Sequence, residues 1–388
     1  MKKIKLRIYQ FYIVIKYIIF VFINIFINIF INTKENVWLI SERGTDARDN
    51  AYVFYKYLKS KQPDIKVKYV INKESPDFHK IVEHDLLKPG SFKHIYYYLN
   101  SSKLISTHIM GFAPEMRIFN KFRKIKLFQP KGKVIFLQHG ITSNYIDFLR
   151  YDNVGKINLF ISASKMEYEF LLNTYGYNES IVKYTGFARY DNLINLNEKS
   201  ILLMPTWRKK LFYIGDYNNF TQTDYYKKFN SLINNKKLIN YLEENDFKLY
   251  FYPHYEVQKY INTFKCDSKR IILSNMKDYD VQDLLKRSRV LVTDYSSVFY
   301  DFAYMKKEVI YYQFDYEEFY GKHYGKGNFD FVDNGFGPVC KEENEVVENI
   351  IKICENGIED KYLERINEYF TLDKNNNCER IYNEIIKL

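Results

Sequence analysis

Residues 290–302 read Val-Leu-Val-Thr-Asp-Tyr-Ser-Ser-Val-Phe-Tyr-Asp-Phe. The first four residues form a short β-branched run that is typical of a buried strand. The run then turns through small hydroxyl residues into a segment that carries Phe299 and Phe302 at helical spacing. A strand that leads directly into a helix is the repeating unit of a doubly wound α/β sheet. The stretch therefore predicts an α/β fold with parallel strands.

The same alternation extends in both directions along the chain. Two β-α series in tandem predict two doubly wound domains, with ligands at the carboxyl ends of the strands and in the cleft between the domains. A polar stretch near residues 190–200 marks the boundary, and residues 343–388 are expected to form two or three helices. The expected strands are Val37–Ile40, Val67–Ile71, Leu104–Thr107, Lys133–Leu137 and Leu159–Ser162, then Ile201–Met204, Lys248–Tyr252, Arg270–Leu273, Val290–Thr293 and Val309–Tyr312, with helices between them such as Asn50–Lys59 and Lys165–Thr174.

Composition limits the classes of function. The chain has 388 residues, 46% of them hydrophobic, which excludes a single small module and a disordered tail. Its net charge is +11, but the first 33 residues hold five basic residues and no acidic one, so residues 34–388 carry +6. That excess favours anionic small molecules or lipid headgroups and is too weak for a protein that coats a nucleic-acid polymer. The four cysteines show neither a disulfide framework nor paired zinc spacing, as expected in a reducing compartment.

The amino-terminal segment Phe11–Ile31 is long and apolar enough to associate with a membrane. A signal peptide is disfavoured, because no small-residue cleavage site follows the apolar run. A spanning helix and a helix lying in the interface both remain open, the latter with Lys16, Asn24, Asn28 and Asn32 as a polar stripe. The alternating repeat over residues 22–30 is also compatible with a strand.

Two histidines follow apolar runs directly, at the position where open α/β sheets place ligand residues. His139 comes after Lys133–Gln138 and before Gly140, and it is a candidate general base. His254 comes after Tyr252 and Pro253 and faces the same expected cleft from the second domain. A histidine that is merely satisfied by backbone hydrogen bonds in a turn remains the alternative for each.

Other strand ends carry groups suited to an anionic ligand. Free amides at the helix start, with the hydroxyls of Ser296 and Ser297, make a phosphate site, although helix capping by one serine fits the same pattern. Thr206 and Trp207 end another strand beside Arg208, which suits a base ring or a phosphate, and domain-hinge packing is the alternative for the tryptophan.

Further polar stretches lie nearby. The charged stretch Ser41–Asn50 follows the first strand, where it holds an acceptor or caps the next helix, and Arg189 near the domain boundary adds a cation. Asp278 and Asp280 have the Asp-X-Asp form of some metal sites, but Asp280 is expected to cap the helix after it, so no metal site and no cofactor are predicted.

These motifs, in this order, resemble the CDP-glycerol glycerophosphotransferase family of teichoic-acid and capsule synthesis. The resemblance rests on Trp38–Asn50, Gln138–Gly140, Gly186–Asp191, Pro205–Arg208, Pro253–His254 and Thr293–Asp301. It implies a GT-B-like pair of Rossmann-like domains facing a cleft, preceded by a membrane-associating helix. The expected division is residues 1–33 for the membrane segment, 34–195 for the acceptor domain and 196–388 for the CDP-polyol domain.

The resemblance also implies roles for individual residues. His139 would be the catalytic base and His254 would assist at the phosphates. Donor contacts carried over by position are Gly140, Ile141, Thr142, Ser143, Arg189, Thr206, Trp207, Tyr252, Pro253, Ser296, Ser297 and Asp301. Three positions depart from the family pattern: Ala188 and Tyr255 stand where prolines are usual, and Ala51 where glycine is common.

The expected reaction is transfer of glycerol phosphate from CDP-glycerol to a hydroxyl of a polyprenyl-diphosphate-linked saccharide or glycan acceptor, with release of CMP. CDP-ribitol as donor, a GT-B nucleotide-sugar glycosyltransferase and an inactive membrane scaffold are the alternatives. The chain length resembles the short members of the family, which include primases. We expect a peripheral location on the cytoplasmic face of the cell membrane and no nucleic-acid polymer as partner, and homo-oligomerisation stays open.

Overall fold

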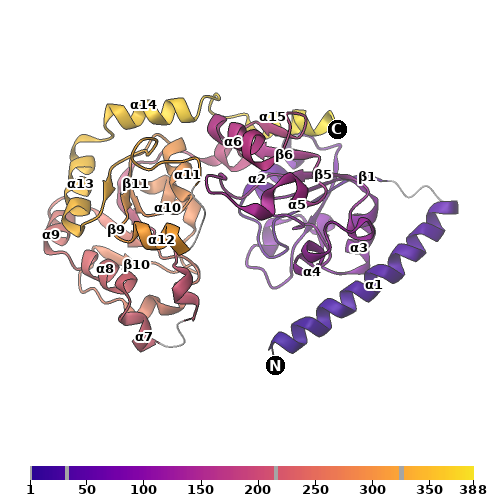
Figure 1. Ribbon diagram of the computed structural model, residues 1–388, viewed down its shortest axis with the longest axis horizontal. Helices are drawn as coiled ribbons and strands as arrows, with labels where there is room; N and C mark the ends of the chain where they lie inside the picture. Colours follow the sequence, from indigo (N-terminus) through magenta and orange to yellow (C-terminus); the bar gives the residue numbers. More distant parts are fainter. Residues whose placement is uncertain (1, 31–34, 214–216, 323–326) are drawn as a thin grey trace. The chain divides into compact units, whose positions relative to one another are not determined.

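The computed structural model describes residues 2–30, 35–213, 217–322 and 327–388. The chain divides into two compact units (Figure 1). Unit 1 comprises Met1–Ile141, Ile146–Asn192 and Leu372–Leu388, and unit 2 comprises Thr142–Tyr145 and Leu193–Thr371. Each unit is built on one parallel sheet, 7-stranded in unit 1 and 6-stranded in unit 2, which confirms the predicted pair of α/β folds.

The sheet of unit 1 has the order β3-β2-β1-β4-β5-β6-β7. All five predicted strands are present, and their interiors are buried on both faces, as a parallel sheet covered by helices requires. The strands that the sequence did not predict, β3 and β7, are only 2 and 3 residues long. The strands are β1 (Glu35–Ser41), β2 (Lys66–Val70), β3 (Leu86–Leu87), β4 (Ser101–Ser106), β5 (Lys133–Phe136), β6 (Leu159–Ser162) and β7 (Val182–Tyr184).

Local signals fix the ends of the helices in unit 1. In α6, the Ser164 hydroxyl accepts a hydrogen bond from the Glu167 amide, and Gly176 ends the helix in the left-handed conformation at φ 79°. The α-helices of unit 1 are α1 (Lys2–Phe30), α2 (Asn50–Lys61), α3 (Phe92–Asn100), α4 (Met116–Lys121), α5 (Tyr151–Val154), α6 (Lys165–Tyr175) and α15 (Asn377–Ile386). Its 3-10 helices are η1 (Phe78–Lys80), η2 (Glu83–Asp85), η3 (Lys126–Phe128), η4 (Asp147–Leu149) and η5 (Ala188–Asn192).

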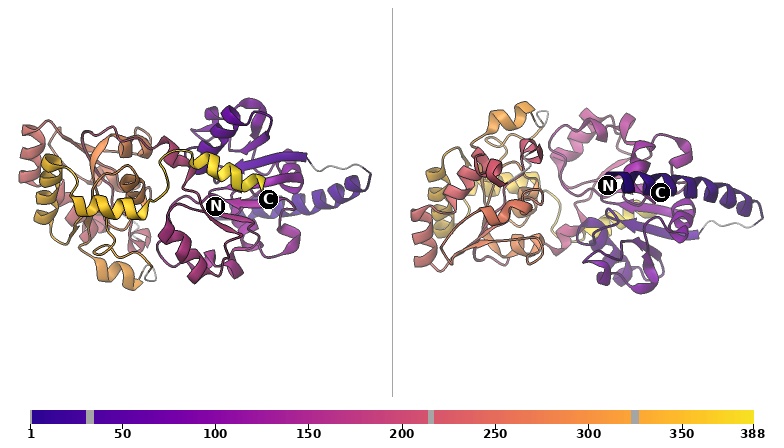
Figure 2. Two further views of the ribbon diagram at one scale, coloured as in Figure 1. Left: turned by 90° about the horizontal axis from the view of Figure 1, so that it is seen from above. Right: turned by 90° about the horizontal axis from the view of Figure 1, so that it is seen from below.

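The carboxyl-terminal helix α15 returns to unit 1, whereas the sequence assigned all of residues 196–388 to the second domain (Figure 2). The Asp191 carboxylate accepts hydrogen bonds from the amides of Asn377 and Cys378, at 2.9 and 2.8 Å, and so caps α15. The apolar side of α15 is buried, and Tyr382 packs against Trp38 of β1 with ring centroids 6.1 Å apart. The charged surface of α15 gave no sequence signal for this return.

The apolar segment is helical to Phe30, so the alternating repeat does not form a strand. Helix α1 lies along unit 1, with Ile13 and Tyr17 buried. Two of the side chains expected as a polar stripe contact the rest of unit 1: the Lys16 ammonium donates to the Gly90 carbonyl at 2.9 Å, and Asn24 is buried. The remaining stripe position Asn28 belongs to the helix, and Asn32 lies outside the described residues.

The sheet of unit 2 has the order β10-β9-β8-β11-β12-β13, and its five predicted strands are all present. A large apolar cluster covers one face of this sheet, beneath α8, α9 and α13. Strand β13, which was not predicted, has 2 residues. The strands are β8 (Glu198–Leu203), β9 (Lys248–Phe251), β10 (Ile271–Leu273), β11 (Ser288–Thr293), β12 (Val309–Tyr312) and β13 (Val339–Cys340).

The carboxyl-terminal region forms three helices, α13, α14 and α15, in agreement with the prediction. The α-helices of unit 2 are α7 (Tyr217–Thr221), α8 (Asp224–Leu232), α9 (Lys236–Glu244), α10 (Val281–Arg287), α11 (Val298–Tyr304), α12 (Tyr316–Lys322), α13 (Glu343–Asn356) and α14 (Asp360–Tyr369), with 3-10 helices η6 (Lys209–Tyr213) and η7 (Gln258–Thr263).

Candidate active site

The strand order of unit 1 places its ligand crevice at the carboxyl ends of β1 and β4. These neighbouring strands continue into connections that run in opposite directions across the sheet, which opens a crevice between them. Glu42 and Arg43 follow β1, Thr107 and His108 follow β4, and His139 follows the adjacent strand β5. The sheet therefore gathers the first predicted histidine and a second one, His108, which the sequence analysis did not select.

The turn that presents His139 is fixed from several sides. Gln138 has a left-handed backbone at φ 58°, a strained conformation for a residue other than glycine. Its side-chain amide donates to the Ile161 carbonyl at 2.7 Å and to the Glu167 carboxylate at 3.0 Å. The buried Asn50 amide donates to the Gln138 carbonyl at 2.8 Å. These bonds hold the strained turn and therefore the direction in which His139 leaves the sheet.

The surroundings of His139 determine its tautomer. Its Nδ1 lies 3.3 Å from the Thr107 carbonyl oxygen, which can only accept a hydrogen bond. Nδ1 therefore carries the proton, and Nε2 keeps its lone pair. Desolvation by the surrounding chain lowers the pKa of His139 from its ordinary value, and Asp49 opposes this shift. Nearby Arg189 acts in the same direction as desolvation. His139 is thus a neutral imidazole with an available basic nitrogen.

His108 stacks on His139, with ring centroids 4.4 Å apart and an interplanar angle of 9°. The Nδ1 atom of His108 pairs with the Thr107 hydroxyl oxygen at 2.9 Å. Desolvation, and then the charges of His139 and Arg43, lower the pKa of His108 to about 2. The ring of His108 is therefore neutral and restricts the plane of the His139 ring. The sequence signal that could have identified His108 is its position directly after the expected strand Leu104–Thr107.

Arg189 lies in unit 1 within η5 and is only 5% exposed. Its guanidinium forms an ion pair with Asp49 at 3.0 Å, and its backbone amide donates to the Asn50 side chain at 3.0 Å. The same two residues begin α2, so Arg189 is held beside the turn that carries His139. Arg189, which was predicted as a donor contact together with Ser296 and Ser297, therefore lies in the other unit.

In unit 2 the ends of β8, β9 and β11 meet at one edge, because these strands are neighbours in the sheet. The Thr206 amide donates to the Asp294 carboxylate at 2.8 Å, which links the loops after β8 and β11. Trp207 and His254 stack with ring centroids 6.0 Å apart, which links the loops after β8 and β9. Three of the predicted motifs therefore converge within this unit.

His254 is a neutral hydrogen-bond donor in the free protein. Its Nδ1 accepts a hydrogen bond from the Glu256 amide at 3.3 Å, so the proton of the neutral ring lies on Nε2. Desolvation lowers the pKa of His254 to about 4, and the charge of Glu256 only partly opposes it. A ring with this pKa is uncharged near neutrality. It can donate from Nε2 to a phosphate oxygen without carrying a positive charge.

Arg208 is committed to two carboxylates within the protein. Its guanidinium bonds Asp315 through two nitrogens, at 2.6 and 3.0 Å, and contacts Asp294 at 2.9 Å. Burial alone would lower the pKa of Arg208, but these two carboxylates raise it. The suggested role of Arg208 at a base or phosphate is therefore replaced by a structural one: it ties the loops after β8, β11 and β12 together.

The remaining predicted donor contacts differ in accessibility. Ser297 is exposed and Ser296 partly exposed, and the Ser297 side chain forms no cap on α11. Tyr252 and Pro253 are buried, as is Asp301, which is 4% exposed. The serine hydroxyls are thus available to a ligand, whereas the three buried residues shape the edge from below.

The segment after His139 is divided between the two units. Gly140 and Ile141 belong to unit 1, whereas Thr142 and Ser143 belong to unit 2. The Ser143 carbonyl accepts a hydrogen bond from the Asn328 amide at 3.1 Å. A side chain at the neighbouring Gly327 would meet that carbonyl, since its Cβ would lie 1.7 Å from the oxygen. This close backbone approach fixes the segment in unit 2.

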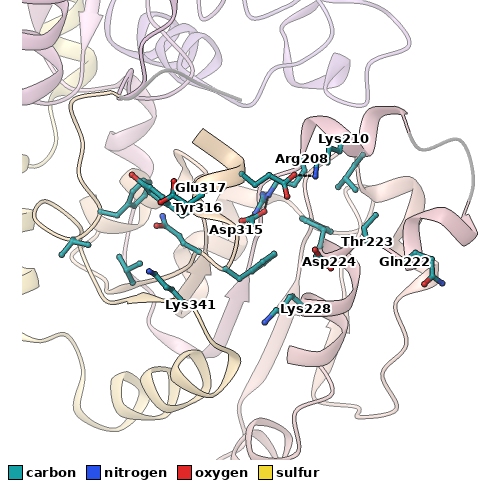
Figure 3. Close-up of a pocket in the computed structure, with 18 of the residues that line it drawn as sticks. Arg208, Lys210, Gln222, Thr223, Asp224, Lys228, Asp315, Tyr316, Glu317 and Lys341 are labelled. Atoms are coloured by element: carbon teal, nitrogen blue, oxygen red, sulfur yellow. Dashed lines mark hydrogen bonds and ion pairs between the residues drawn. The ribbon is translucent and has the colours of Figure 1, made fainter. Parts of the chain in front are cut away.

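A cavity of about 840 Å³ opens in unit 2 beside Arg208. Figure 3 shows Lys210, Asp224 and Lys228 on one side of it and Tyr316 and Lys341 on the other. Its lining mixes cations, carboxylates and aromatic rings, and its size is in the range of small-molecule sites.

The Asp-X-Asp sequence has the structural role that was expected for it. The Asp280 carboxylate accepts hydrogen bonds from the amides of Gln282 and Asp283, at 2.8 and 3.4 Å, and so caps α10. Across the described parts of the chain, no three His, Cys, Asp or Glu side chains are grouped so that they could hold a metal ion.

Comparison with known proteins identifies relatives along almost the whole chain. The family model described as CDP-Glycerol:Poly(glycerophosphate) glycerophosphotransferase matches residues 21–387. The minor teichoic acid biosynthesis protein GgaB of Bacillus subtilis (strain 168) is 36% identical over 373 residues, which is 92% of this chain and 40% of GgaB. A teichoic acid glycerol-phosphate transferase of Staphylococcus aureus (strain NCTC 8325 / PS 47) is 26% identical over 217 residues, 54% of this chain and 52% of that protein. The chain thus spans about half the length of these relatives.

A solved structure of the wall teichoic acid polymerase TagF has a similar fold. The match has a TM-score of 0.67 at 16% sequence identity and covers 92% of this chain and 89% of that chain. It confirms the expected GT-B-like class, with two Rossmann-like α/β units.

Proposed function

The chain belongs to the CDP-glycerol:poly(glycerophosphate) glycerophosphotransferase family, and from this premise we propose that it transfers glycerol phosphate from CDP-glycerol to a hydroxyl of a membrane-linked acceptor in teichoic-acid or capsule synthesis. The observation that carries the proposal is the neutral His139 ring, whose Nδ1 is engaged by Thr107 and whose Nε2 is available as a base.

In the proposed step, the acceptor oxygen forms a bond to the β-phosphorus of the donor. The bond between that phosphorus and the bridging oxygen breaks, and CMP leaves with the bonding electrons. The hydroxyl proton passes to Nε2 of His139. His254 donates a hydrogen bond from Nε2 to a phosphate oxygen, where negative charge builds up. No redox partner and no cofactor are needed.

The donor is proposed to bind the sheet edge of unit 2. Ser296, Ser297 and Trp207 are accessible there beside His254. The cavity near Arg208 opens at the loops after β8 and β12. The further donor contacts proposed by family position are Gly140, Ile141, Thr142, Ser143, Arg189, Thr206, Tyr252, Pro253 and Asp301.

The proposed location is the cytoplasmic face of the cell membrane, with α1 lying in the interface. Among the helices that the structure describes, one apolar segment, Ile4–Ile27, meets the length and hydropathy of a membrane span. Its contacts with unit 1 run from Gln10, which donates to Glu115 at 3.3 Å, to the buried Asn24. A spanning orientation would have to break them, so these contacts favour an in-plane helix.

The test is release of CMP from CDP-glycerol, CDP-ribitol and UDP-sugars in parallel, with a lipid-linked disaccharide and a glycerol-phosphate-primed acceptor. CDP-glycerol should be used preferentially. Preferential use of CDP-ribitol or of a UDP-sugar would show that CDP-glycerol is not the donor. Normal turnover by folded His139→Ala protein would show that His139 is not the base. If CDP-glycerol at millimolar concentration leaves the melting temperature of the wild type unchanged, the inactive scaffold is favoured instead.

A further inference from the structure

Helix α1 presents an apolar outer face that is not covered by the described residues of unit 1. The exposed side chains of α1 include Ile4, Ile8, Phe11, Tyr12, Ile15, Ile19, Phe22, Ile23, Ile25, Phe26 and Ile27. Such a face is typical of a helix that lies in a membrane interface. The surface of unit 1 next to α1 is then within reach of lipid headgroups.

A pocket of about 350 Å³ lies on this surface, between α1, α3 and the edge of the sheet. Its lining includes Phe20 of α1 and Phe92 of α3, whose ring centroids are 6.0 Å apart. Tyr96, Tyr97 and two leucines complete its apolar wall. Because Phe20 belongs to α1 itself, the pocket is continuous with the proposed membrane-binding helix.

The polar groups of the pocket are basic. Lys68, His84 and Lys93 line it, and none of its lining residues in the described chain is acidic. The Lys68 ammonium donates a hydrogen bond to the His84 carbonyl at 2.5 Å and lies 5.9 Å from the centre of the Tyr97 ring. These contacts hold the Lys68 side chain in the pocket. Lys93 is exposed on α3. The pocket therefore combines aromatic walls with positive charge.

Further cations lie on the same flank. The Lys16 ammonium sits 4.1 Å from the centre of the Phe92 ring. Burial, and then the nearby charge of Lys88, lower the pKa of Lys16, as expected where positive charges are concentrated. Anionic headgroups are the complementary charge that a membrane supplies.

We propose that this pocket binds the phosphate headgroup of an anionic phospholipid of the membrane on which α1 lies, with the phosphate at Lys68 and Lys93 and the first acyl carbons against Phe20 and Phe92. This inference rests on the membrane location proposed above. A lipid bound in this pocket can keep its acyl chains in the bilayer only when the pocket faces the bilayer. The site therefore fixes the rotation of unit 1 about the α1 axis.

The first experiment uses short-chain lipids that stay monomeric, titrated into the detergent-solubilised full chain by calorimetry. Dihexanoyl phosphatidylglycerol should bind saturably, whereas dihexanoyl phosphatidylcholine, glycerol phosphate and inorganic phosphate should bind much more weakly. Two lysine contacts to an anionic headgroup correspond to about 30-fold in affinity, so a Lys68→Gln/Lys93→Gln protein should lose about that factor. Equal binding of free phosphate would overturn the assignment to a lipid.

A matched control separates the pocket from general surface attraction. Lys5 of α1 and Lys121 of α4 are exposed residues of unit 1 that do not line the pocket. A Lys5→Gln/Lys121→Gln protein has the same charge change and should bind the short-chain lipid as the wild type does. If both double variants weaken binding equally, the pocket is wrong. Lys93→Gln alone, on the exposed side of α3, provides a second test should Lys68→Gln disturb the sheet.

The outcome is distinguishable from failure of the proposed function. Flotation of the wild type with phosphatidylcholine vesicles containing phosphatidylglycerol tests membrane association, and CMP release tests the reaction. If the wild type floats with the vesicles and releases CMP, but Lys68→Gln/Lys93→Gln protein binds the short-chain lipid with unchanged affinity, the headgroup site is refuted. The membrane location and the proposed reaction would then still stand.

Discussion

The protonation state of His254 leads to a quantitative prediction for the pH dependence of turnover. With a pKa of about 4, only about one molecule in a thousand carries a charged His254 at pH 7, since each pH unit changes the ratio tenfold. A mechanism that needed the imidazolium would therefore cost about 4 kcal/mol at that pH, an upper value because solvent screens this partly exposed ring.

The structure instead supplies a neutral donor, because Nδ1 of His254 accepts from the Glu256 amide and leaves the proton on Nε2. The His254 ring is fully neutral well above pH 4 and becomes charged as the pH falls through that value. His139 has a lowered pKa too, so its basic form is lost only below its ordinary value of 6.5. We therefore expect kcat/KM, which reports on the free protein, to be constant between pH 7 and 8.

The assay is initial CMP release at subsaturating CDP-glycerol over that pH range. His254→Gln keeps a side-chain NH donor and should retain most activity, whereas His254→Leu should lose about 10–150-fold, the value of a hydrogen bond to a charged group. Unchanged melting temperatures are the control for folding. A wild-type kcat/KM that falls about tenfold per pH unit from 7 to 8, with His254→Gln abolishing the slope, would show that the charged ring acts and would refute the reasoning.

Three further perturbations follow from the structure. His139→Asn should lower kcat by about 10²–10⁴, the usual contribution of a general base, with little change in melting temperature, and near-normal kcat would contradict its role. Arg208→Met should cost about 3–5 kcal/mol in urea unfolding because it leaves Asp294 and Asp315 unpaired, whereas Lys237→Met, at an exposed ion pair, should cost less than about 1 kcal/mol. Asn24→Leu and Asn100→Leu should each destabilise the docked helix by about 1–3 kcal/mol, and the double variant by less than their sum; strict additivity in denaturation would disprove the buried amide pair.

The strands that could be predicted are those with enough residues to show a pattern. Every predicted strand of the two sheets is present, because burial on both faces of a parallel sheet demands continuous apolar side chains. Strands β3, β7 and β13 have 2 to 3 residues at sheet edges and were not predicted. Strand β10 also has 3 residues at an edge, but all three are apolar and β10 was predicted, whereas β7 is interrupted by Lys183 and β3 and β13 have only 2 residues. The orientation of α1 was equally hidden: Lys16 and Asn24 looked solvent-facing but bind unit 1, since polar side chains also satisfy backbone carbonyls and one another.

The site residues that could be predicted stand just after expected strands. His139 and His254 were found in this way, and their tautomers emerged only from the positions of Thr107 and Glu256 relative to the rings. His108 was missed because its importance depends on a ring stack between two neighbouring strand ends. Arg208 was interpreted as a ligand residue because its partner Asp315 lies 107 positions away in the sequence.

The return of α15 also has a consequence for how the protein is made. Unit 1 contains Met1–Ile141 and Ile146–Asn192 but is completed by Leu372–Leu388. Residues 193–371 are synthesised in between, which takes roughly 9–36 s at about 5–20 residues per second. During that interval the face that later receives Ile381 and Tyr382 lies open beside Trp38. Until α15 has been synthesised, the first unit is therefore incomplete, and the apolar surface that α15 covers stays exposed.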